Sequence, residues 1–368
     1  MKTAAVMFGA GTRPEIIKIS PIIRAFERKD VPFVFVHSGQ HYDYNLSLQF
    51  IEELGLPKPD FDLKVRERSP GRQTGRILIG FEKAIKKFKP SILLVEGDTN
   101  SVLAAALAAN KNNVALGHVE AGLRSFDLRM PEEHNRRLVD HISNYLFAPT
   151  SVAKENLIRE NVWGAIYVTG NTVIDACIEN LPLAEKKSNI MSIIDVKEYI
   201  LATIHRSENV DNPEVLRNFI EAFEESPLPV VVPLHPRTVN RLKRLKLWTK
   251  IKKSCNVKVL PPVGYFDFLI LMKNSRLIMT DSGGIQEEAT APPIRKFVLI
   301  LRTSTERPEA IKAGFARITG VSKDRILLIL KEALERKVLL PETSPFGDGM
   351  SGERITDIIL GKILPRLK

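Results

Sequence analysis

Three acidic side chains in the first half of the sequence have positions suited to acid–base chemistry. Asp98, Glu120 and Glu132 lie in the polar segments 96–100, 118–124 and 131–137. Carboxylates gathered at one place raise one another's pKa, so that some stay protonated near neutrality while others remain charged. Such a group supplies both an acid and a base. The alternative for Glu132 is structural, because Arg136 follows it at the spacing of an ordinary helix ion pair.

A second set of residues is suited to holding a diphosphate. Gly283 and Gly284 lie between a predicted strand and a predicted helix. Their backbone amides, the start of the helix and the Ser282 hydroxyl would together form an anion cradle. An ordinary helix N-cap by Asp281 or Ser282 explains the same residues equally well. Glu288, one turn into that helix, could accept hydrogen bonds from ribose hydroxyls.

Cationic and imidazole side chains follow other predicted strands. The segment 11–18 joins a strand to a helix and contains Arg13 and Lys18, which could pair with phosphates or form surface ion pairs. It has neither the P-loop spacing nor the third glycine of the dinucleotide fingerprint. His205 follows an apolar strand and precedes several polar residues, which favours a ligand site over a buried structural histidine.

The elements that must position these residues alternate in type. Short β-branched runs each precede a polar or glycine-containing turn and a helix, which is typical of parallel sheets built from βαβ units. The first series of strands is predicted at Thr3–Phe8, Phe33–His37, Ser91–Val95, Val114–Val119 and Tyr145–Ala148. A second series begins near Ile166 and continues at Tyr199–Ile204, Val230–Leu234, Val257–Leu260, Leu277–Thr280 and Phe297–Leu301. Doubly wound sheets bind ligands beyond the carboxyl ends of their strands, where the polar residues above are placed.

The length of the chain favours two domains. A single core stops growing at roughly 250–300 residues, and the chain has 368. We therefore expect an α/β protein of two doubly wound, Rossmann-like domains facing a cleft. Residues 1–170 form the N-terminal domain with the carboxylates, and residues 171–350 form the C-terminal domain. Residues 351–368 form a final helix that packs back towards the N-terminal domain.

Composition excludes several classes of protein. The net charge is +11, yet the densest basic stretch, Asn240–Lys253, spaces its apolar residues as in a helix with a solvated basic face. No nucleic-acid motif accompanies it, so no nucleic-acid partner is predicted. No run approaches the ~20 apolar residues that a membrane span needs. The cysteines, Cys177 and Cys255, are far apart and indicate free thiols in a cytoplasmic protein. No metal-ligand spacing is present, and no metal or cofactor is predicted.

Eight short segments occur together in a specific order. They are Gly11–Lys18, Gly97–Thr99, Val119–Arg124, Pro131–Glu133, Thr203–Asn209, Asp281–Glu288, Thr305–Glu309 and Pro345–Gly349. With this ordered set the chain resembles the non-hydrolysing UDP-N-acetylglucosamine 2-epimerases along nearly its whole length. The segments Gln40–Asn45 and Ser125–Met130 are most similar to those of archaeal members.

The resemblance implies the glycosyltransferase-B architecture, with UDP held mainly by the second domain and the sugar in the cleft. It implies UDP-binding positions at Arg13, Lys18, His205, Phe268, Ser282, Gly283, Gly284, Glu288 and Arg307. It implies catalytic carboxylates at Asp98, Glu120 and Glu132, supported by Arg136 and His205. Homodimers are usual in the family, and a second UDP-N-acetylglucosamine acts as activator in bacterial members. Candidate positions for that activator are Gln40, His41, Arg72 and Gln73.

The implied reaction is reversible inversion of C2, which interconverts UDP-N-acetylglucosamine and UDP-N-acetylmannosamine through a 2-acetamidoglucal. Asp98 and Glu120 are predicted to act at C2, with Glu132 assisting. A glycosyltransferase of the same architecture, a hydrolysing epimerase and a catalytically silent nucleotide-sugar sensor are the alternatives.

The chain departs from the family pattern at three places. The segment Thr290–Phe297 is longer than usual and lacks a glycine, and Val263 stands where a polar residue near the uracil is common in bacterial members. Gly352 replaces a usual serine. We expect these changes to affect one loop, the uracil contacts and the packing of the tail.

Overall fold

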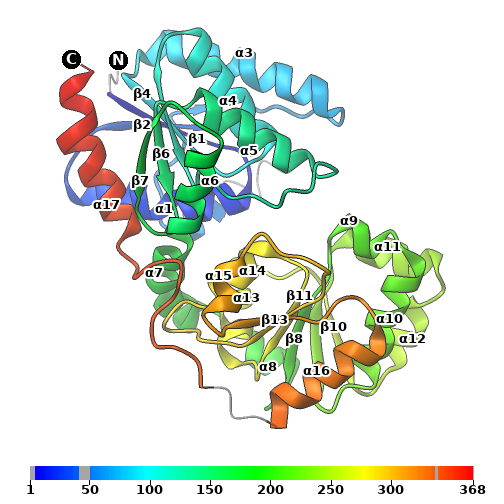
Figure 1. Ribbon diagram of the computed structural model, residues 1–368. Coiled ribbons are helices and arrows are strands. Elements are labelled where there is room, and N and C mark those ends of the chain that lie inside the picture. The colour runs from blue at the N-terminus through cyan, green and yellow to red at the C-terminus, as the bar shows by residue number, and fades with distance from the viewer. Residues whose placement is uncertain (1–4, 41–49, 336–338, 368) are drawn as a thin grey trace. The chain divides into compact units, whose positions relative to one another are not determined.

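The structure is a computed structural model that describes residues 5–40, 50–335 and 339–367. The chain divides into two compact units (Figure 1). The first unit comprises Met1–Ala176 together with Phe346–Lys368, and the second comprises Cys177–Pro345. Helix α7 (Thr172–Lys187) contains the first point of division. Among the described residues, no helix is long and apolar enough to cross a membrane.

The first unit is built on a parallel sheet with the strand order β3-β2-β1-β4-β5-β6-β7. The strands are β1 (Val6–Ala10), β2 (Phe33–His37), β3 (Phe61–Asp62), β4 (Ile92–Glu96), β5 (Ala115–Val119), β6 (Tyr145–Ala148) and β7 (Ala165–Val168). The helices are α1 (Arg13–Arg28), α3 (Pro70–Phe88), α4 (Asn100–Lys111), α5 (Pro131–Ile142), α6 (Ser151–Arg159) and α17 (Ser351–Ile358). Helices α3, α4 and α5 pack side by side, and α1 packs against α17 (Figure 1).

Apolar residues cover both faces of this sheet, as expected for parallel strands. Met7 of β1 belongs to the core that includes Phe81 of α3. Its neighbour Phe8 points to the opposite face, where its ring meets the ring of Phe26 of α1 edge-on at 5.2 Å. This two-sided burial fixes the strand register, so the positions of the residues that follow each strand are also fixed.

The second unit contains another parallel sheet, with the strand order β10-β9-β8-β11-β12-β13. The strands are β8 (Ile200–Thr203), β9 (Val230–Pro233), β10 (Val257–Leu260), β11 (Ile278–Thr280), β12 (Val298–Ile300) and β13 (Ala316–Ile318). The helices are α8 (Ile190–Ile194), α9 (Ser207–Val210), α10 (Pro213–Glu224), α11 (Pro236–Arg244), α12 (Trp248–Lys253), α13 (Tyr265–Asn274), α14 (Gly283–Glu288), α15 (Pro308–Lys312) and α16 (Lys323–Glu335). The predicted fold class, with two doubly wound parallel sheets, is confirmed.

Three expectations about the elements were wrong. The strand near Ile166 does not open the second series, because β7 pairs in parallel with β6 in the first sheet. Strands β3 and β13 were missed, since each has only two or three residues and neither forms a β-branched run. The basic stretch Asn240–Lys253 forms parts of two helices, because Lys246 between them adopts a left-handed backbone with φ +59°.

The end of the chain packs on α1 through a close backbone approach. A Cβ atom on Gly352 would lie 2.8 Å from the carbonyl carbon of Pro21. The Gly352 amide donates to Oδ1 of Asp175 at 2.7 Å, which anchors the start of α17. A π-helical turn (Ile359–Ile363) and a 3-10 turn (Leu364–Arg366) follow α17. Glycine at position 352, in place of the usual serine, therefore fits a contact with Pro21 that has no room for a side chain.

We predict that Gly352→Ala destabilises the protein by about 1–3 kcal/mol, the usual cost of overpacking, because the added methyl group must push α17 away from Pro21. The control is Gly75→Ala in α3, where an added Cβ meets no atom within 4 Å. That variant should gain roughly 0.5–1 kcal/mol from the higher helix propensity of alanine. Urea unfolding followed by circular dichroism measures both. Equal stability of the two variants would contradict the packing described here.

Candidate active site

The carboxyl ends of three neighbouring strands of the first unit carry a group of acidic side chains. Strands β1, β4 and β5 are adjacent in the sheet. Glu96 ends β4, Asp98 follows it, and Glu120 follows β5. Helix α1 starts beyond β1 and contributes Glu15 and Lys18. This edge, called the carboxyl edge below, is where doubly wound sheets bind their ligands.

One ammonium group at the carboxyl edge serves two carboxylates. Nζ of Lys18 lies 3.2 Å from Oε1 of Glu96 and donates a hydrogen bond to Oε2 of Glu120. Nδ2 of Asn171 also donates to Oε2 of Glu120, at 3.2 Å. Glu96 and Glu120 are 1% and 8% exposed. Glu120 adopts φ +67°, a left-handed backbone that is unusual for a residue with a side chain and is often found at functional sites.

The carboxylates of this cluster favour different protonation states. Burial raises the pKa of Glu96 well above its usual value, and the charge of Glu120 adds to the effect while Lys18 opposes it. Burial also raises the pKa of Glu15, although hydrogen bonds from Thr99, Thr12 and the Gly11 amide oppose this shift. The edge therefore favours a neutral acid beside a charged carboxylate, which is the pairing that acid–base catalysis needs. Sequence reasoning missed Glu96 and Glu15 as site residues.

Asp98 is held by residues of α5. Its Oδ2 accepts a hydrogen bond from a terminal nitrogen of Arg136 at 2.5 Å. Its backbone carbonyl accepts from Nδ2 of Asn135 at 2.9 Å. Asp98 remains part-exposed, since 28% of its side chain is accessible. The guanidinium of Arg136 therefore orients the carboxylate of Asp98.

The ion pair between Glu132 and Arg136, which was the structural alternative for Glu132, is absent among the described residues. Arg136 pairs with Asp98 and with Glu133, the latter at 3.2 Å. Glu132 is half-buried in the first turn of α5, and its side chain makes no hydrogen bond or ion pair with another described residue. Its carboxylate differs in this respect from those of Asp98 and Glu120.

Glu133, the neighbour of Glu132, stabilises the loop next to the site. It is buried, and its carboxylate accepts hydrogen bonds from the Ser125 amide and hydroxyl, both at 2.9 Å. Burial would raise the pKa of Glu133, but the bonds from Ser125 and the charge of Arg136 outweigh it and lower the pKa below its usual value. This charged group ties the loop before α5 to the helix that holds Asp98.

In the second unit, a buried carboxylate organises the residues around His205. Asp281 is fully buried and accepts hydrogen bonds from the backbone amides of His205 at 3.1 Å and Arg206 at 3.0 Å. Nδ2 of Asn209 donates to it at 3.1 Å, and Nδ1 of His205 lies 3.3 Å from its Oδ1. Asp281 therefore fixes the segment after β8, and the His205 side chain stays half-exposed.

The Gly283–Gly284 segment opens α14, as predicted. Ser282 occupies the N-cap position, but its side chain forms no capping hydrogen bond with the described residues. The alternative of an ordinary N-cap by Asp281 or Ser282 was therefore wrong. A Cβ on Gly283 would lie 2.5 Å from Oε1 of Glu306, whereas a Cβ on Gly284 would meet open space. The amides at the start of α14 are thus not occupied by a side-chain cap, and the backbone can approach a ligand.

Arg307 lies behind this glycine segment and is already paired. It is 5% exposed, and its Nε donates to Oε1 of Glu287 at 2.6 Å. The charges of Arg307 and Arg302 outweigh the effect of burial and lower the pKa of Glu306 to about 2. The positive charge near the cradle is therefore part of a buried network. Phe268 of α13 and Glu288 of α14, two further predicted positions, are half-buried.

A cavity of about 340 Å³ lies beyond the ends of β8 and β9 in the second unit. His205, His235 and Ile285 line it, together with Thr203, Ile204, Pro233 and Arg237. It combines apolar walls with two imidazoles next to the start of α14, a composition suited to a planar polar ring.

The structure brings together two of the proposed activator residues in the first unit. Oε1 of Gln40 accepts from the Ser101 amide at 2.9 Å, and Nε2 of Gln73 donates to the Glu67 carbonyl at 3.2 Å and to the Gln40 carbonyl at 3.4 Å. Arg72 is exposed. His41 lies outside the described residues.

Arg13, a predicted phosphate ligand, is exposed, with its guanidinium 5.4 Å from the centre of the Phe50 ring.

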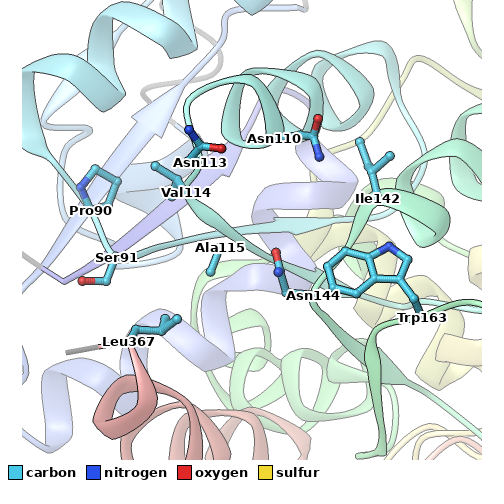
Figure 2. A pocket seen from close by; sticks show the side chains of 10 residues that line it. All are labelled: Pro90, Ser91, Asn110, Asn113, Val114, Ala115, Ile142, Asn144, Trp163 and Leu367. Atoms are coloured by element: carbon cyan, nitrogen blue, oxygen red, sulfur yellow. The ribbon is translucent and has the colours of Figure 1, made fainter.

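A pocket of about 450 Å³ lies at the opposite, amino ends of β4 and β5 (Figure 2). Asn110, Asn113, Asn144 and Trp163 are among its lining side chains, and none of the lining side chains in the described part of the chain is charged. It therefore lacks the acids, bases and cations that the carboxyl edge provides. Within residues 5–40, 50–335 and 339–367, no group of three or more histidine, cysteine or acidic side chains could hold a metal ion.

Comparison with known proteins gives one consistent family. Residues 24–360 match the family model described as UDP-N-acetylglucosamine 2-epimerase. The chain is 46% identical to a UDP-N-acetylglucosamine 2-epimerase of Methanocaldococcus jannaschii over 358 residues, covering 95% of this chain and 97% of the relative. It is 39% identical to a UDP-2,3-diacetamido-2,3-dideoxy-D-glucuronate 2-epimerase of Pseudomonas aeruginosa, over 95% of this chain and 97% of that protein.

Solved structures agree with the sequence comparison. A crystal structure of the M. jannaschii UDP-GlcNAc 2-epimerase in complex with UDP-GlcNAc and UDP matches with a TM-score of 0.88 and 46% identity, covering 96% of this chain and 99% of that chain. A Staphylococcus aureus MnaA–UDP structure matches with a TM-score of 0.83 and 34% identity, covering 100% of this chain and 98% of that chain.

We predict that Glu96→Gln changes how stability depends on pH. Because the pKa of Glu96 is raised in the folded state, the folded protein keeps this proton to higher pH than the unfolded chain does. Stability is therefore lost as the pH rises above the ordinary glutamate value of 4.5. The variant lacks this loss, so its free energy of unfolding should rise relative to wild type between pH 4.5 and neutrality. Urea unfolding at several pH values measures the difference.

The matched control is Glu155→Gln, which removes a carboxylate that is 60% exposed on α6 of the same unit. Its difference from wild type should not vary with pH in this way. A difference between Glu96→Gln and wild type that falls with rising pH would show that Glu96 is charged in the folded protein.

Proposed function

The chain belongs to the UDP-N-acetylglucosamine 2-epimerase family, and we propose that it interconverts UDP-N-acetylglucosamine and UDP-N-acetylmannosamine by inverting C2 of the sugar. The observation that carries the proposal is the pair of carboxylates at neighbouring strand ends, Glu120 beside Lys18 and Asp98 beside Arg136. Two separately oriented carboxylates next to a third acid that favours its neutral form are suited to removing and returning a proton.

The chemistry of the substrate explains why a leaving group is needed. The C2 hydrogen of this sugar is not next to a carbonyl carbon, so its removal alone would leave a very unstable carbanion. We propose that the C2–H and C1–O bonds both break, a C1=C2 double bond forms, and the electron pair of the C1–O bond leaves with the β-phosphate of UDP. The bound 2-acetamidoglucal then takes UDP back at C1 and a proton at C2 on the opposite face.

Each set of residues has a role in this scheme. Asp98 and Glu120 act at C2, and Glu132, which is part-exposed, assists. His205, Ser282 and the amides of Gly283 and Gly284 hold the diphosphate, where negative charge builds as the C1–O bond breaks.

Further UDP contacts are assigned to Arg13, Lys18, Phe268, Glu288 and Arg307. Lys18 and Arg307 already pair with acidic side chains, so their contacts with phosphate would be shared ones. We further propose that the protein is a homodimer and that a second, activating UDP-N-acetylglucosamine binds near Gln40 and Gln73. The reaction at C2 requires neither.

The test is proton NMR of the purified chain with UDP-N-acetylglucosamine in deuterium oxide. The proposal predicts UDP-N-acetylmannosamine and deuterium at C2 of both epimers. Free N-acetylmannosamine with UDP would identify a hydrolysing epimerase. Binding without any reaction would favour a glycosyltransferase or a sensor. Turnover only of a UDP-2,3-diacetamido sugar acid, the substrate in the name of the Pseudomonas relative, would keep the reaction and change the substrate.

We predict that Asp98→Asn and Glu120→Gln each lower kcat by about 10²–10⁴-fold, the usual contribution of a positioned acid or base. UDP affinity, measured by calorimetry, should stay close to that of wild type, because the proposed diphosphate contacts lie mainly in the second unit. Glu155→Gln is again the control, and its kcat should not change. Near-normal turnover by both site variants would remove these residues from the mechanism.

A further inference from the structure

A buried acidic residue of the first unit, Asp140, contacts the residues on either side of Glu120 and is linked through one of them to the residue before Asp98. Asp140 lies in the last turn of α5 and is fully buried. Its Oδ1 lies 2.7 Å from Nδ1 of His118. Its Oδ2 accepts from the Gly122 amide at 3.2 Å and lies 2.8 Å from a terminal nitrogen of Arg124. The two residues His118 and Gly122 flank Glu120 in the sequence.

His118 extends the contact to the next strand. Its Nε2 lies 2.8 Å from the carbonyl oxygen of Gly97. A carbonyl oxygen only accepts hydrogen bonds, so Nε2 carries a hydrogen and donates it. Gly97 has φ +86° and directly precedes Asp98. The chain of contacts from Asp140 through His118 therefore ends on the peptide that carries Asp98.

Helix α5 holds Asp98 at a second point. Arg136 lies one turn before Asp140 on the same helix and pairs directly with the Asp98 carboxylate. The placement of α5 against the sheet thus sets the position of the Asp98 carboxylate as well. Asp140 is a buried group that fixes this part of α5 directly against the end of β5 and, through His118, against the end of β4.

The Asp140 carboxylate is suited to this task because it is charged. Burial would raise the pKa of Asp140, but the contacts with His118 and Arg124 outweigh it and lower the pKa below its usual value. Arg124 also donates to both carboxylate oxygens of Glu160, at 2.8 and 2.6 Å. Two carboxylates therefore share one guanidinium, but only Asp140 also contacts His118 and Gly122.

We propose that Asp140 is a positioning residue for proton transfer at C2, which holds the peptides of Asp98 and Glu120 in their working geometry. The proposal rests on the epimerase function proposed above. Misplacing a reacting group by about 1 Å can cost about 10²-fold in rate. A neutral side chain at position 140 should therefore slow the chemical step more than it weakens substrate binding.

The test compares Asp140→Asn with Glu160→Gln. Each variant removes one negative charge from beside Arg124, but only the first also removes the charge that faces His118 and the Gly122 amide. We expect Asp140→Asn to lower kcat by about 10²-fold with KM and the UDP dissociation constant within about threefold of wild type. Glu160→Gln should keep kcat within about threefold. Equal kcat values for the two variants would overturn the proposal.

The kinetic isotope effect with UDP-N-acetylglucosamine deuterated at C2 separates positioning from partial unfolding. A smaller folded fraction lowers kcat but leaves the isotope effect unchanged. Misplaced acids make proton transfer more rate-limiting, so the effect should rise in Asp140→Asn. A lowered kcat with an unchanged isotope effect would mean that Asp140 only stabilises the fold.

His118→Gln provides a second variant if Asp140→Asn does not fold. It leaves the Asp140–Arg124 contact in place. It removes the imidazole ring that contacts Asp140 on one side and the Gly97 carbonyl on the other. The same fall in kcat and rise in isotope effect are expected. A wild-type rate in this variant would overturn the proposal, whereas a wild-type chain without any epimerisation would overturn the proposed function itself.

Discussion

The architecture of the first unit depends on burying several carboxylates at one edge of a parallel sheet, where Lys18 and Arg136 pair with them. Like charges in a protein interior repel strongly, by about 4 kcal/mol at 4 Å for an effective dielectric constant of about 20. Burial raises the pKa of Glu96, the charge of Glu120 adds to the shift, and Lys18, which is shared between the two acids, only partly opposes it. Asp98 escapes this competition because Arg136 provides a separate cation. Burial first, and the neighbouring charge of Glu120 second, thus favour the neutral form of Glu96.

The strands were predictable where a full apolar run stood between polar turns. Phe33–His37, Tyr145–Ala148 and Val257–Leu260 match the structure residue for residue. The sheet to which β7 belongs could not be read from its residues, because a strand's neighbours depend on where the connecting helix returns the chain. The break at Lys246 was hidden for a related reason, since the apolar spacing of Leu242, Leu245 and Trp248 continues across it.

For the site residues, too, some positions follow from the sequence pattern and others only from the packing of the folded chain. The rule that ligands bind beyond strand ends placed Asp98 and Glu120 on neighbouring strands without any knowledge of contacts. The structural alternative of an ion pair between Glu132 and Arg136 was wrong, because the fold brings Asp98 within reach of Arg136. Glu96 and Asp140 carry no sequence signal of their own: one ends an apolar strand and the other lies on an ordinary amphipathic helix. Their importance comes from burial and from partners distant in sequence, which only the folded chain defines.

The central claim is that proton removal at C2 accompanies cleavage of the C1–O bond. UDP-N-acetylglucosamine labelled with ¹⁸O in the bridge between C1 and the β-phosphate tests it directly by ³¹P NMR. If UDP leaves and returns, the label should move into the non-bridging β-phosphate positions while deuterium from the solvent enters C2. A label that stays in the bridge while C2 exchanges its hydrogen would contradict the claim, because it would mean that C2 is inverted without departure of UDP.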